Sequence, residues 1–209
     1  MSAAPSTIEK IVWSLLALVI VGIGVTFVFF AKPKTPALPL PVYSQIADFT
    51  LTNQTGRAVS LADFKGRIWI ADIIFTRCAG PCSAMTRQMA ELLTTLPAAV
   101  QCVTLTTDPE FDTPAVLNSY GEQFKANFAR WQFLTGSKRE IGRLAIDGLK
   151  LTALDVPAEK RTDAADLFVH STIFVLVDKQ ARVRGTFESA EPDFKTKILG
   201  AIQQLEREK

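Results

Sequence analysis

The chain has few of the residues from which reactive sites are usually built. Of its 209 residues, one is histidine, three are cysteine and two are tyrosine. It also lacks a strong excess of either charge, with 23 Lys and Arg against 21 Asp and Glu. No run of basic residues is long enough to form a phosphate-binding patch. The sequence therefore predicts no nucleic-acid partner, and any metal or thiol site must use a small set of side chains.

The N-terminal part lacks charge altogether over one long stretch. Residues 11–31 have no charged side chain, and Lys10 and Lys32 flank them. A helix of this length spans roughly 30 Å, which is the thickness of the hydrocarbon layer of a bilayer. A cleavable signal peptide usually has a shorter apolar region and a small-residue cleavage site, which this stretch lacks. We expect an uncleaved transmembrane anchor at residues 11–31, after a short cytoplasmic tail at residues 1–10.

Proline is concentrated directly after this stretch. In residues 32–47, prolines recur every two or three positions between 33 and 41. Such segments favour extended polyproline geometry and act as semi-rigid spacers. We therefore expect a linker at residues 32–47, followed by one domain at residues 48–209, which is long enough to bury its own core.

The rest of the chain alternates between apolar β-rich runs and amphipathic segments. Strands are expected at residues 49–52, 58–60, 67–75, 100–106, 132–134, 172–177 and 182–187, and helices at residues 81–96, 113–128, 138–149 and 191–207. The order strand-helix-strand-helix, followed by strand-strand-helix, is thioredoxin-like. The predicted fold class is α/β, with a mixed sheet flanked by helices and an added N-terminal transmembrane helix.

Two of the three cysteines lie in the sequence FTRCAGPCSAM, with three residues between them. Cys78 follows a predicted buried strand, and Cys82 is expected in the first turn of the next helix. Sites of α/β proteins usually form at this edge of the sheet. The Ala-Gly-Pro residues between the cysteines predict an irregular, exposed loop. Because a helix N-terminus favours anions, we also expect a lowered thiol pKa. The pair fits a disulfide switch or a metal clamp, and ordinary buried packing is the alternative.

The only histidine, His170, precedes an apolar strand in the sequence VHSTIFVLVD. In a thioredoxin-like layout, the start of that strand faces the turn that carries Cys78 and Cys82. Two thiolates and one imidazole suit Cu(I) and can also hold Cu(II). A structural zinc site would need a fourth protein ligand, and the sequence offers no convincing one. The sequence therefore favours a copper site at these three residues.

Several other residues invite a functional interpretation but have a simpler one. Met85 and Met89 are spaced as part of a helix stripe that faces a core. Cys102 lies in the middle of the predicted strand VQCVTLT and is expected to be a buried packing thiol. Arg77 either lowers the pKa of Cys78 by its charge or is an ordinary solvated loop residue.

Together these motifs resemble the Sco/SenC family of copper-binding, thioredoxin-fold assembly factors for cytochrome c oxidase. The resemblance covers about residues 46–205 and rests on the turn FTRC-x3-C, the segment TTDPEFDTP and the segment HSTIFVLVD. It implies that Cys78, Cys82 and His170 are the metal ligands. It also implies that Asp108 lies near the copper loop, where it supports the ligands or contacts a partner.

Two functions follow, and they differ in their need for His170. The first is a membrane-anchored copper chaperone, not an enzyme, that delivers one copper to the copper-centre subunit of cytochrome c oxidase. The second is a thiol-disulfide oxidoreductase, in which Cys78 and Cys82 reduce the acceptor's cysteines before metal loading and His170 is dispensable. A peroxidase of the peroxiredoxin kind is disfavoured, because Phe75 occupies the position of the threonine that such enzymes need.

Both functions require an oxidising or copper-handling compartment outside the cytosol. We therefore expect a single-pass protein of the bacterial inner membrane, with residues 32–209 in the periplasm. The mitochondrial inner membrane is the alternative, and the absence of an Arg-rich presequence disfavours it. With no apolar seam evident outside the core, a monomer is expected.

Overall fold

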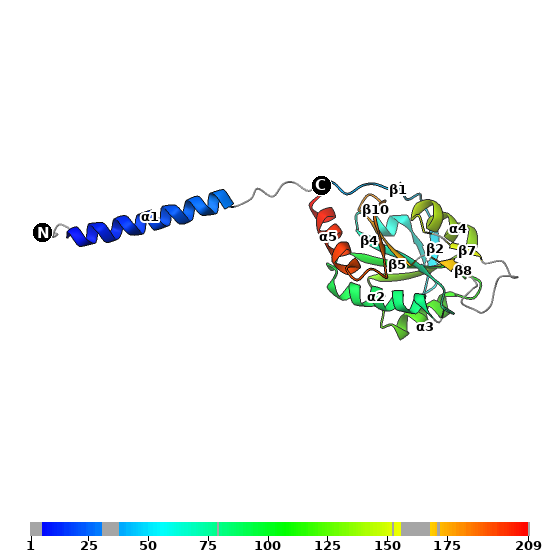
Figure 1. The fold of residues 1–209 in the computed structure, drawn as a ribbon. Helices are drawn as coiled ribbons and strands as arrows, with labels where there is room; N and C mark the ends of the chain where they lie inside the picture. The colour runs from blue at the N-terminus through cyan, green and yellow to red at the C-terminus, as the bar shows by residue number, and fades with distance from the viewer. Residues whose placement is uncertain are drawn as a thin grey trace. The chain divides into compact units, whose positions relative to one another are not determined.

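The structure is a computed structural model that describes residues 6–30, 38–78, 80–151, 153–155, 168–170 and 172–208, with the backbone alone described for residues 27–30, 153–155 and 168–170. The chain divides into two compact units, Met1–Leu38 and Pro39–Lys209 (Figure 1).

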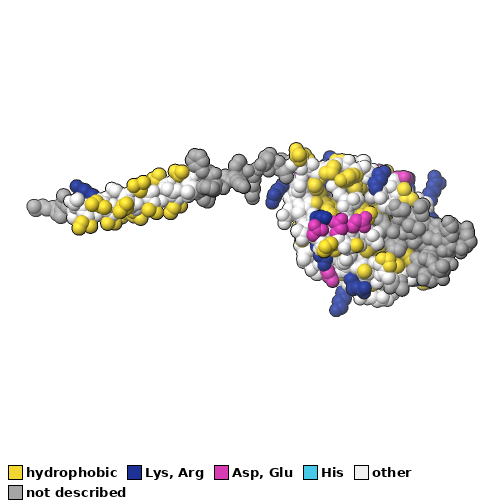
Figure 2. All heavy atoms as spheres, viewed as in Figure 1, with side chains coloured by type: hydrophobic (Ala, Val, Ile, Leu, Met, Phe, Trp, Pro, Cys, Tyr) yellow, Lys and Arg dark blue, Asp and Glu magenta, His cyan; other side chains and the backbone are white. Residues whose placement is uncertain are grey.

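Within the first unit, the described residues form one helix, α1 (Thr7–Phe30). A capping box closes its N-terminus: the Glu9 N–H donates to Ser6 Oγ (3.3 Å), and the Ser6 N–H donates to Glu9 Oε2 (2.8 Å). This cap explains why the helix begins at Thr7 and not at residue 11. The segment Thr7–Thr26 has a mean hydropathy of 2.1 and is long and apolar enough to cross a membrane. Figure 2 shows hydrophobic side chains along this helix.

The second unit is built on an eight-stranded mixed sheet, ordered β1-β10-β9-β4-β5-β6-β2-β3. Its strands are β1 (Ser44–Gln45), β2 (Thr50–Asn53), β3 (Ala58–Ser60), β4 (Trp69–Ile74), β5 (Gln101–Thr106), β6 (Trp131–Thr135), β9 (Ile173–Val177) and β10 (Arg182–Glu188). Strands β4, β5 and β6 run parallel, and β9 runs antiparallel to β4. The carboxyl ends of β4 and β5 and the start of β9 therefore meet at one edge of the sheet.

Helices cover both faces of this sheet, as the thioredoxin-like order predicts. Helices α2 (Pro81–Thr95), α3 (Pro114–Gln123) and α5 (Phe194–Arg207) contribute buried residues to one core, which we call the α2 core. The 3-10 turn η1 (Leu61–Phe64), helix α4 (Lys138–Gly142) and the π-helical turn η2 (Arg143–Gly148) contribute to a second core on the other face. The predicted fold class is confirmed.

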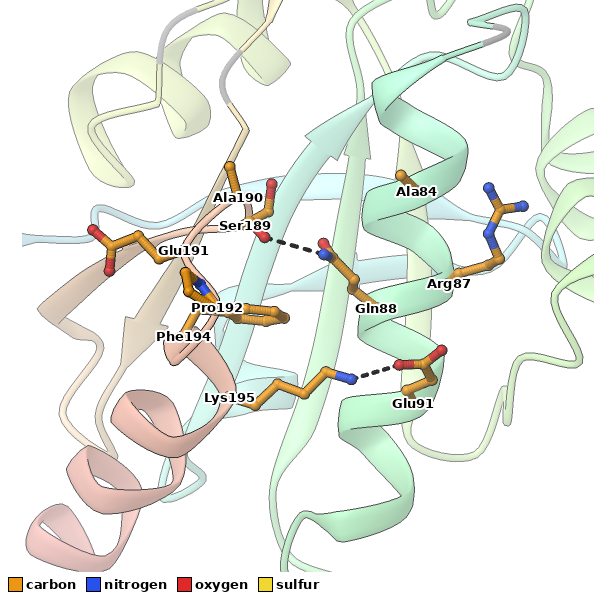
Figure 3. A pocket seen from close by; sticks show the side chains of 10 residues that line it. All are labelled: Ala84, Arg87, Gln88, Glu91, Ser189, Ala190, Glu191, Pro192, Phe194 and Lys195. Carbon is orange, nitrogen blue, oxygen red and sulfur yellow. Dashed lines mark hydrogen bonds and ion pairs between the residues drawn. The ribbon is translucent and has the colours of Figure 1, made fainter.

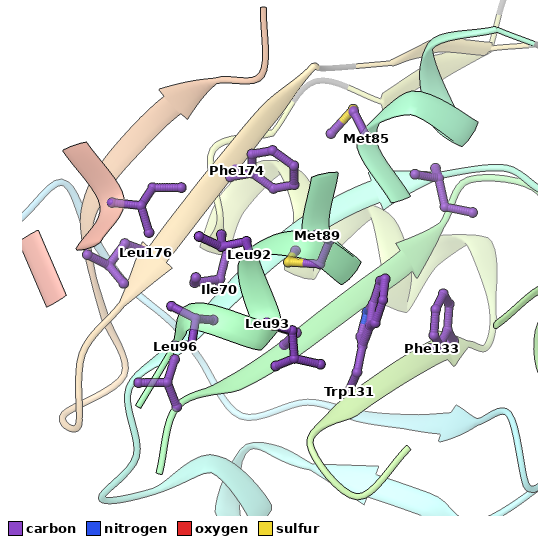
Figure 4. Packing of buried hydrophobic residues seen from close by; sticks show 14 of the residues in the cluster. Ile70, Met85, Met89, Leu92, Leu93, Leu96, Trp131, Phe133, Phe174 and Leu176 are labelled. Atoms are coloured by element: carbon purple, nitrogen blue, oxygen red, sulfur yellow. The ribbon is translucent and has the colours of Figure 1, made fainter. Parts of the chain in front are cut away.

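The α2 core depends on one stripe of α2 (Figure 4). Met85 and Met89 are 1% and 0% exposed, and they pack with Leu92, Ile70 and Phe174. Each fully buried apolar side chain of this size stabilises the fold by roughly 1.5–3 kcal/mol relative to exposure. The prediction that both methionines are core residues is confirmed, and so is the burial of Cys102, at 0% exposure.

The folded domain begins earlier than the predicted linker allows. Strand β1 pairs with β10, and Ile46 is only 2% exposed. The carbonyls of Leu40 and Pro41 accept hydrogen bonds from Arg184. Because these partners lie far away in the sequence, the local proline content could not reveal them. Of the predicted linker at residues 32–47, residues 32–37 lie outside the described residues.

Other boundaries also differ from the prediction. Helix α3 ends at Gln123 and not at residue 128, and Lys125 adopts a left-handed backbone with φ of 55°. The helix predicted at residues 138–149 changes to π-helical geometry at Arg143. A separate two-stranded sheet, β7 (Ala153–Asp155) with β8 (Phe168–His170), was not predicted.

Candidate metal and thiol site

The two cysteines of FTRCAGPCSAM lie where β4 passes into α2. Strand β4 ends at Ile74 and α2 begins at Pro81, so Cys82 occupies the first turn of the helix, as expected. Arg77 and Pro81 are exposed, but Cys78 and Cys82 are only 3% and 0% exposed. The loop is therefore partly exposed, whereas its two cysteines belong to the α2 core.

The two thiols adjoin each other in the reduced state. Neither is in a disulfide, and Cys78 lies close enough to Cys82 to contribute to the rise of its pKa. Burial raises the pKa of Cys82, although the backbone N–H of Phe75 donates to its sulfur and opposes the shift. The expected lowering is thus wrong for Cys82. A helix N-terminus is worth about 0.3–1 kcal/mol to an anion, which is less than the cost of burying a charged thiolate.

A buried carboxylate fixes the loop just before Cys78. Asp112 is 0% exposed and accepts hydrogen bonds from the Thr76 N–H (3.1 Å) and from the hydroxyls of Thr76 and Thr106. Burial raises the pKa of Asp112, and these hydrogen bonds oppose the rise. The network joins the cysteine loop to β5 and to the segment TTDPEFDTP. Sequence reasoning did not single out Asp112, and its place in that segment was the only available signal.

The structure brings Arg77 and Asp108 together beside the cysteines. The Arg77 guanidinium forms an ion pair with Asp108, which is 5% exposed, and it lies over the Phe111 ring, 4.3 Å from the centroid. Arg77 directly precedes Cys78, so the expectation that Asp108 lies near the cysteine loop agrees with this geometry. Arg77 is thus an exposed loop residue whose charge is paired with Asp108.

His170 is described only through its backbone. It ends β8 and pairs with Ala153, and the predicted following strand, β9, starts at Ile173. Strand β9 runs antiparallel to β4 with Val175 opposite Ala71, so its start lies at the edge where the chain leaves toward Cys78. The His170 imidazole and Ala79 lie outside the described residues. Among the side chains that the structure describes, no group of three or more His, Cys, Asp or Glu could hold a metal ion.

A further ionisable residue, Asp72, lies on β4, the strand that leads to the cysteine loop, and was not predicted. It is 0% exposed, in the middle of β4, and neither carboxyl oxygen has a hydrogen-bond partner within the described part of the chain. Burial raises its pKa to about 7. Asp72 also interacts electrostatically with Cys82 and Cys102. The one sequence signal was an acidic residue inside the apolar run WIADII.

The fold and the paired thiols define a thioredoxin-like protein with a dithiol site at the turn between β4 and α2. Residues 41–205 match the family model described as SCO1/SenC. The chain belongs to the SCO1/SenC family.

Curated relatives agree with this assignment. The SCO1 protein homolog of Bacillus subtilis (strain 168) is 32% identical over 172 residues, which are 80% of this chain and 86% of the relative. A putative copper-binding protein of Stutzerimonas stutzeri is 30% identical over 152 residues, 71% of each chain.

Solved structures agree as well. A SCO1/SenC family lipoprotein from Bacillus anthracis str. Ames is 28% identical with a TM-score of 0.72, and the match covers 82% of this chain and 100% of that one. BsSco, a member of the Sco family of cytochrome c oxidase assembly proteins in which a disulfide switch was identified, is 29% identical with a TM-score of 0.69 and the same coverage.

Proposed function

We propose that this protein is a monomeric, membrane-anchored copper chaperone. It binds one copper through Cys78, Cys82 and His170 and delivers it to the copper-centre subunit of cytochrome c oxidase. The observation that carries the proposal is the pair of adjoining, buried thiols at the carboxyl edge of the sheet. Membership in the SCO1/SenC family and the resemblance to a putative copper-binding protein of Stutzerimonas stutzeri support copper as the cargo.

The residues around the pair suit a soft cation. Thiolates are the ligands that favour copper among the common first-row metals, and a thiol loses its proton when it binds. The surrounding apolar side chains of the α2 core exclude water from Cys82. Asp112 and Thr76 hold the backbone that leads to Cys78, so the sulfur positions are preorganised. The start of β9 at this edge supports His170 as the third ligand.

Metal analysis of the reduced full chain in detergent tests this proposal. We expect one copper per wild-type chain, loss of binding in Cys78→Ser and Cys82→Ser, and sharply weaker binding in His170→Ala. Cys102→Ala is the matched control, because it removes the remaining buried thiol and should still bind one copper. Negligible copper in the wild type, or affinity indifferent to His170, would contradict the three-ligand site.

Thiol-disulfide exchange is the second candidate, and a specific observation favours it. Cys78 and Cys82 are free thiols that lie beside each other, which is the arrangement that oxidation to a disulfide requires. The disulfide switch identified in BsSco supports the same chemistry here. If exchange is the main function, the His170→Ala variant should convert the disulfide of an acceptor peptide to thiols at the same rate as the wild type. A rate that falls in parallel with copper affinity would argue against an independent oxidoreductase.

A further inference from the structure

Helix α2 has a pocket on each flank, and the two pockets differ in the number of charged residues that line them. One pocket, of about 500 Å³, lies between α2 and the start of α5 (Figure 3). Its walls carry the charged residues Arg87, Glu91, Glu191 and Lys195, and Lys195 forms an ion pair with Glu91. No cysteine is among the described residues that line it. This charged pocket therefore gives no access to the thiol pair.

The pocket on the opposite flank reaches the thiol pair. We call it the α3 groove; it has a volume of about 550 Å³ and lies between the cysteine loop and α3. Its lining includes Arg77, Cys78, Phe111, Val116, Ser119 and Phe124. Cys82, which is fully buried, is not among the described lining residues. A sulfur atom that enters through the groove consequently meets Cys78 first.

The α3 groove has a mixed lining in which apolar surface predominates, and the Arg87 guanidinium lies near its wall, 6.0 Å from the centroid of the Phe124 ring. Arg77 is the only charged residue among the described lining, and Asp108 neutralises it. Phe111 is 44% exposed, which is unusual for a large apolar side chain of this domain, and the Arg77 guanidinium stacks on its ring. Aromatic residues and arginine dominate the binding energy of many protein interfaces. Val116 and Phe124 extend the apolar wall along α3.

We propose that the α3 groove binds a cysteine-bearing segment of a protein acceptor whose flanking residues are apolar and uncharged, and that it directs the acceptor's sulfur to Cys78. The mainly apolar lining selects against charged flanks, because a charged side chain that lies against Phe111 and Val116 would lose hydration without gaining a partner there. This inference rests on the proposed function in one respect: it assumes that an acceptor cysteine meets the thiol pair, whether for copper transfer or for disulfide exchange.

Short peptides can replace the unidentified acceptor. Each peptide carries one cysteine as a mixed disulfide with 2-nitro-5-thiobenzoate. The Cys78 thiolate attacks the peptide sulfur, a Cys78–peptide disulfide forms, and 2-nitro-5-thiobenzoate leaves with the electron pair of the broken bond. The proton of Cys78 goes to the buffer. In a Cys82→Ser, Cys102→Ala background, the reaction stops at this stage, and the released coloured thiolate gives the rate.

The test compares acetyl-Leu-Cys-Leu-amide, acetyl-Glu-Cys-Glu-amide and acetyl-Lys-Cys-Lys-amide on the full chain in detergent. Each rate is divided by the rate with the mixed disulfide of methanethiol and 2-nitro-5-thiobenzoate. This reference rate reports the intrinsic reactivity of Cys78 in the same variant. We expect the normalised rate of the leucine peptide to be about tenfold higher than those of the glutamate and lysine peptides. Burial of even one apolar side chain stabilises a complex by enough to change an equilibrium constant tenfold.

Substitutions in the groove should change this preference. Val116→Glu and Ser119→Glu should abolish the advantage of the leucine peptide and accelerate the lysine peptide. Lys195→Glu, in the charged pocket on the other flank, is the matched control and should leave the ranking unchanged. Equal normalised rates in the parent protein, or an unchanged ranking in both groove variants, would overturn the proposal.

Copper binding of the wild-type chain separates this inference from the proposed function. Full copper binding without peptide preference would refute the proposed role of the α3 groove and leave the proposed chaperone function unaffected. Peptide preference without copper binding would support the groove and refute the copper cargo.

Discussion

Asp72 is a carboxyl group that the fold buries without a hydrogen-bond partner in the described part of the chain, and its energetic cost depends on pH. Its pKa is about 7 in the folded protein against 3.8 as the ordinary value. The folded state therefore binds the proton more tightly, so stability is highest below pH 4 with respect to this group. It falls as the pH rises from about 4 to 7, and the full penalty of up to about 4 kcal/mol applies above pH 7.

Asp72→Asn should remove this dependence. We expect the variant to be more stable than the wild type at pH 8, by a margin that shrinks steadily toward pH 4.5. Cys82, Cys102 and Tyr120, which interact with Asp72 electrostatically, have raised pKa values and stay neutral over this range. Urea unfolding at several pH values measures the difference. A margin that is the same at every pH would show that Asp72 is ionised, or protonated, throughout.

Asp112 is also buried, but unlike Asp72 it accepts hydrogen bonds from three donors. Asp112→Ala leaves the Thr76 N–H and the hydroxyls of Thr76 and Thr106 without their acceptor. We expect a loss of about 2–4 kcal/mol of unfolding free energy, since each buried unpaired group costs about 1–3 kcal/mol. Alkylation of Cys78 should also become faster, because the loop before it is released. Glu110→Ala, in the same segment but with an 80% exposed side chain, should change neither quantity.

At the scale of elements, local patterns were sufficient for every strand of the eight-stranded sheet except β1, and for the helices that cover it. The apolar run before Cys78 and the stripe of α2 carry strong periodic signals. Strand β1 and the β7–β8 pair carry none, because each is only two or three residues long and depends on a distant partner. The same limit applies to the site. Spacing revealed Cys78 and Cys82, whereas Asp72 and Asp112 belong to it only through contacts in three dimensions.

Arg184 on β10 shows how such distant contacts define an element. It is 3% exposed and binds Asp178, Glu208 and the carbonyls of Leu40 and Pro41. The Leu40 N–H also donates to Glu208 (3.0 Å). One buried guanidinium thus joins the first residues of the domain, the sheet and the end of α5.

Arg184→Met should therefore loosen the start of the domain. We expect a loss of about 3–5 kcal/mol, because Asp178 would remain buried without its main partner. Hydrogen exchange should become faster at residues 40–46. Arg182→Ala is the control: Arg182 also pairs with Asp178, but its side chain is 36% exposed, so its loss should cost less than about 1 kcal/mol. Equal losses of stability in the two variants would mean that the buried contacts of Arg184 stabilise the domain no more than the exposed ion pair of Arg182 does.

At the scale of the whole molecule, the chain combines an apolar helix with a domain that has two cores of its own. The domain contains both cores, and the span Thr7–Thr26 of α1 is long and apolar enough to cross a membrane. We propose that α1 anchors the protein in the bacterial inner membrane and that the domain faces the periplasm, where copper and disulfide chemistry are both available.

The anchor can be tested without disturbing the thiol site. Val19→Lys with Val21→Lys places two charges near the centre of the span, and each costs about 2.5–3.5 kcal/mol at that depth. We expect the double variant to leave the membrane fraction on carbonate extraction and still bind copper, since neither residue belongs to the domain. Glu9→Lys, at the end of the helix, keeps the apolar span intact and should remain in the membrane. For the wild type in spheroplasts, we expect external protease to digest the domain. Protection of the domain would place it in the cytosol. The reducing environment there would keep Cys78 and Cys82 as thiols and leave a disulfide switch without an oxidant.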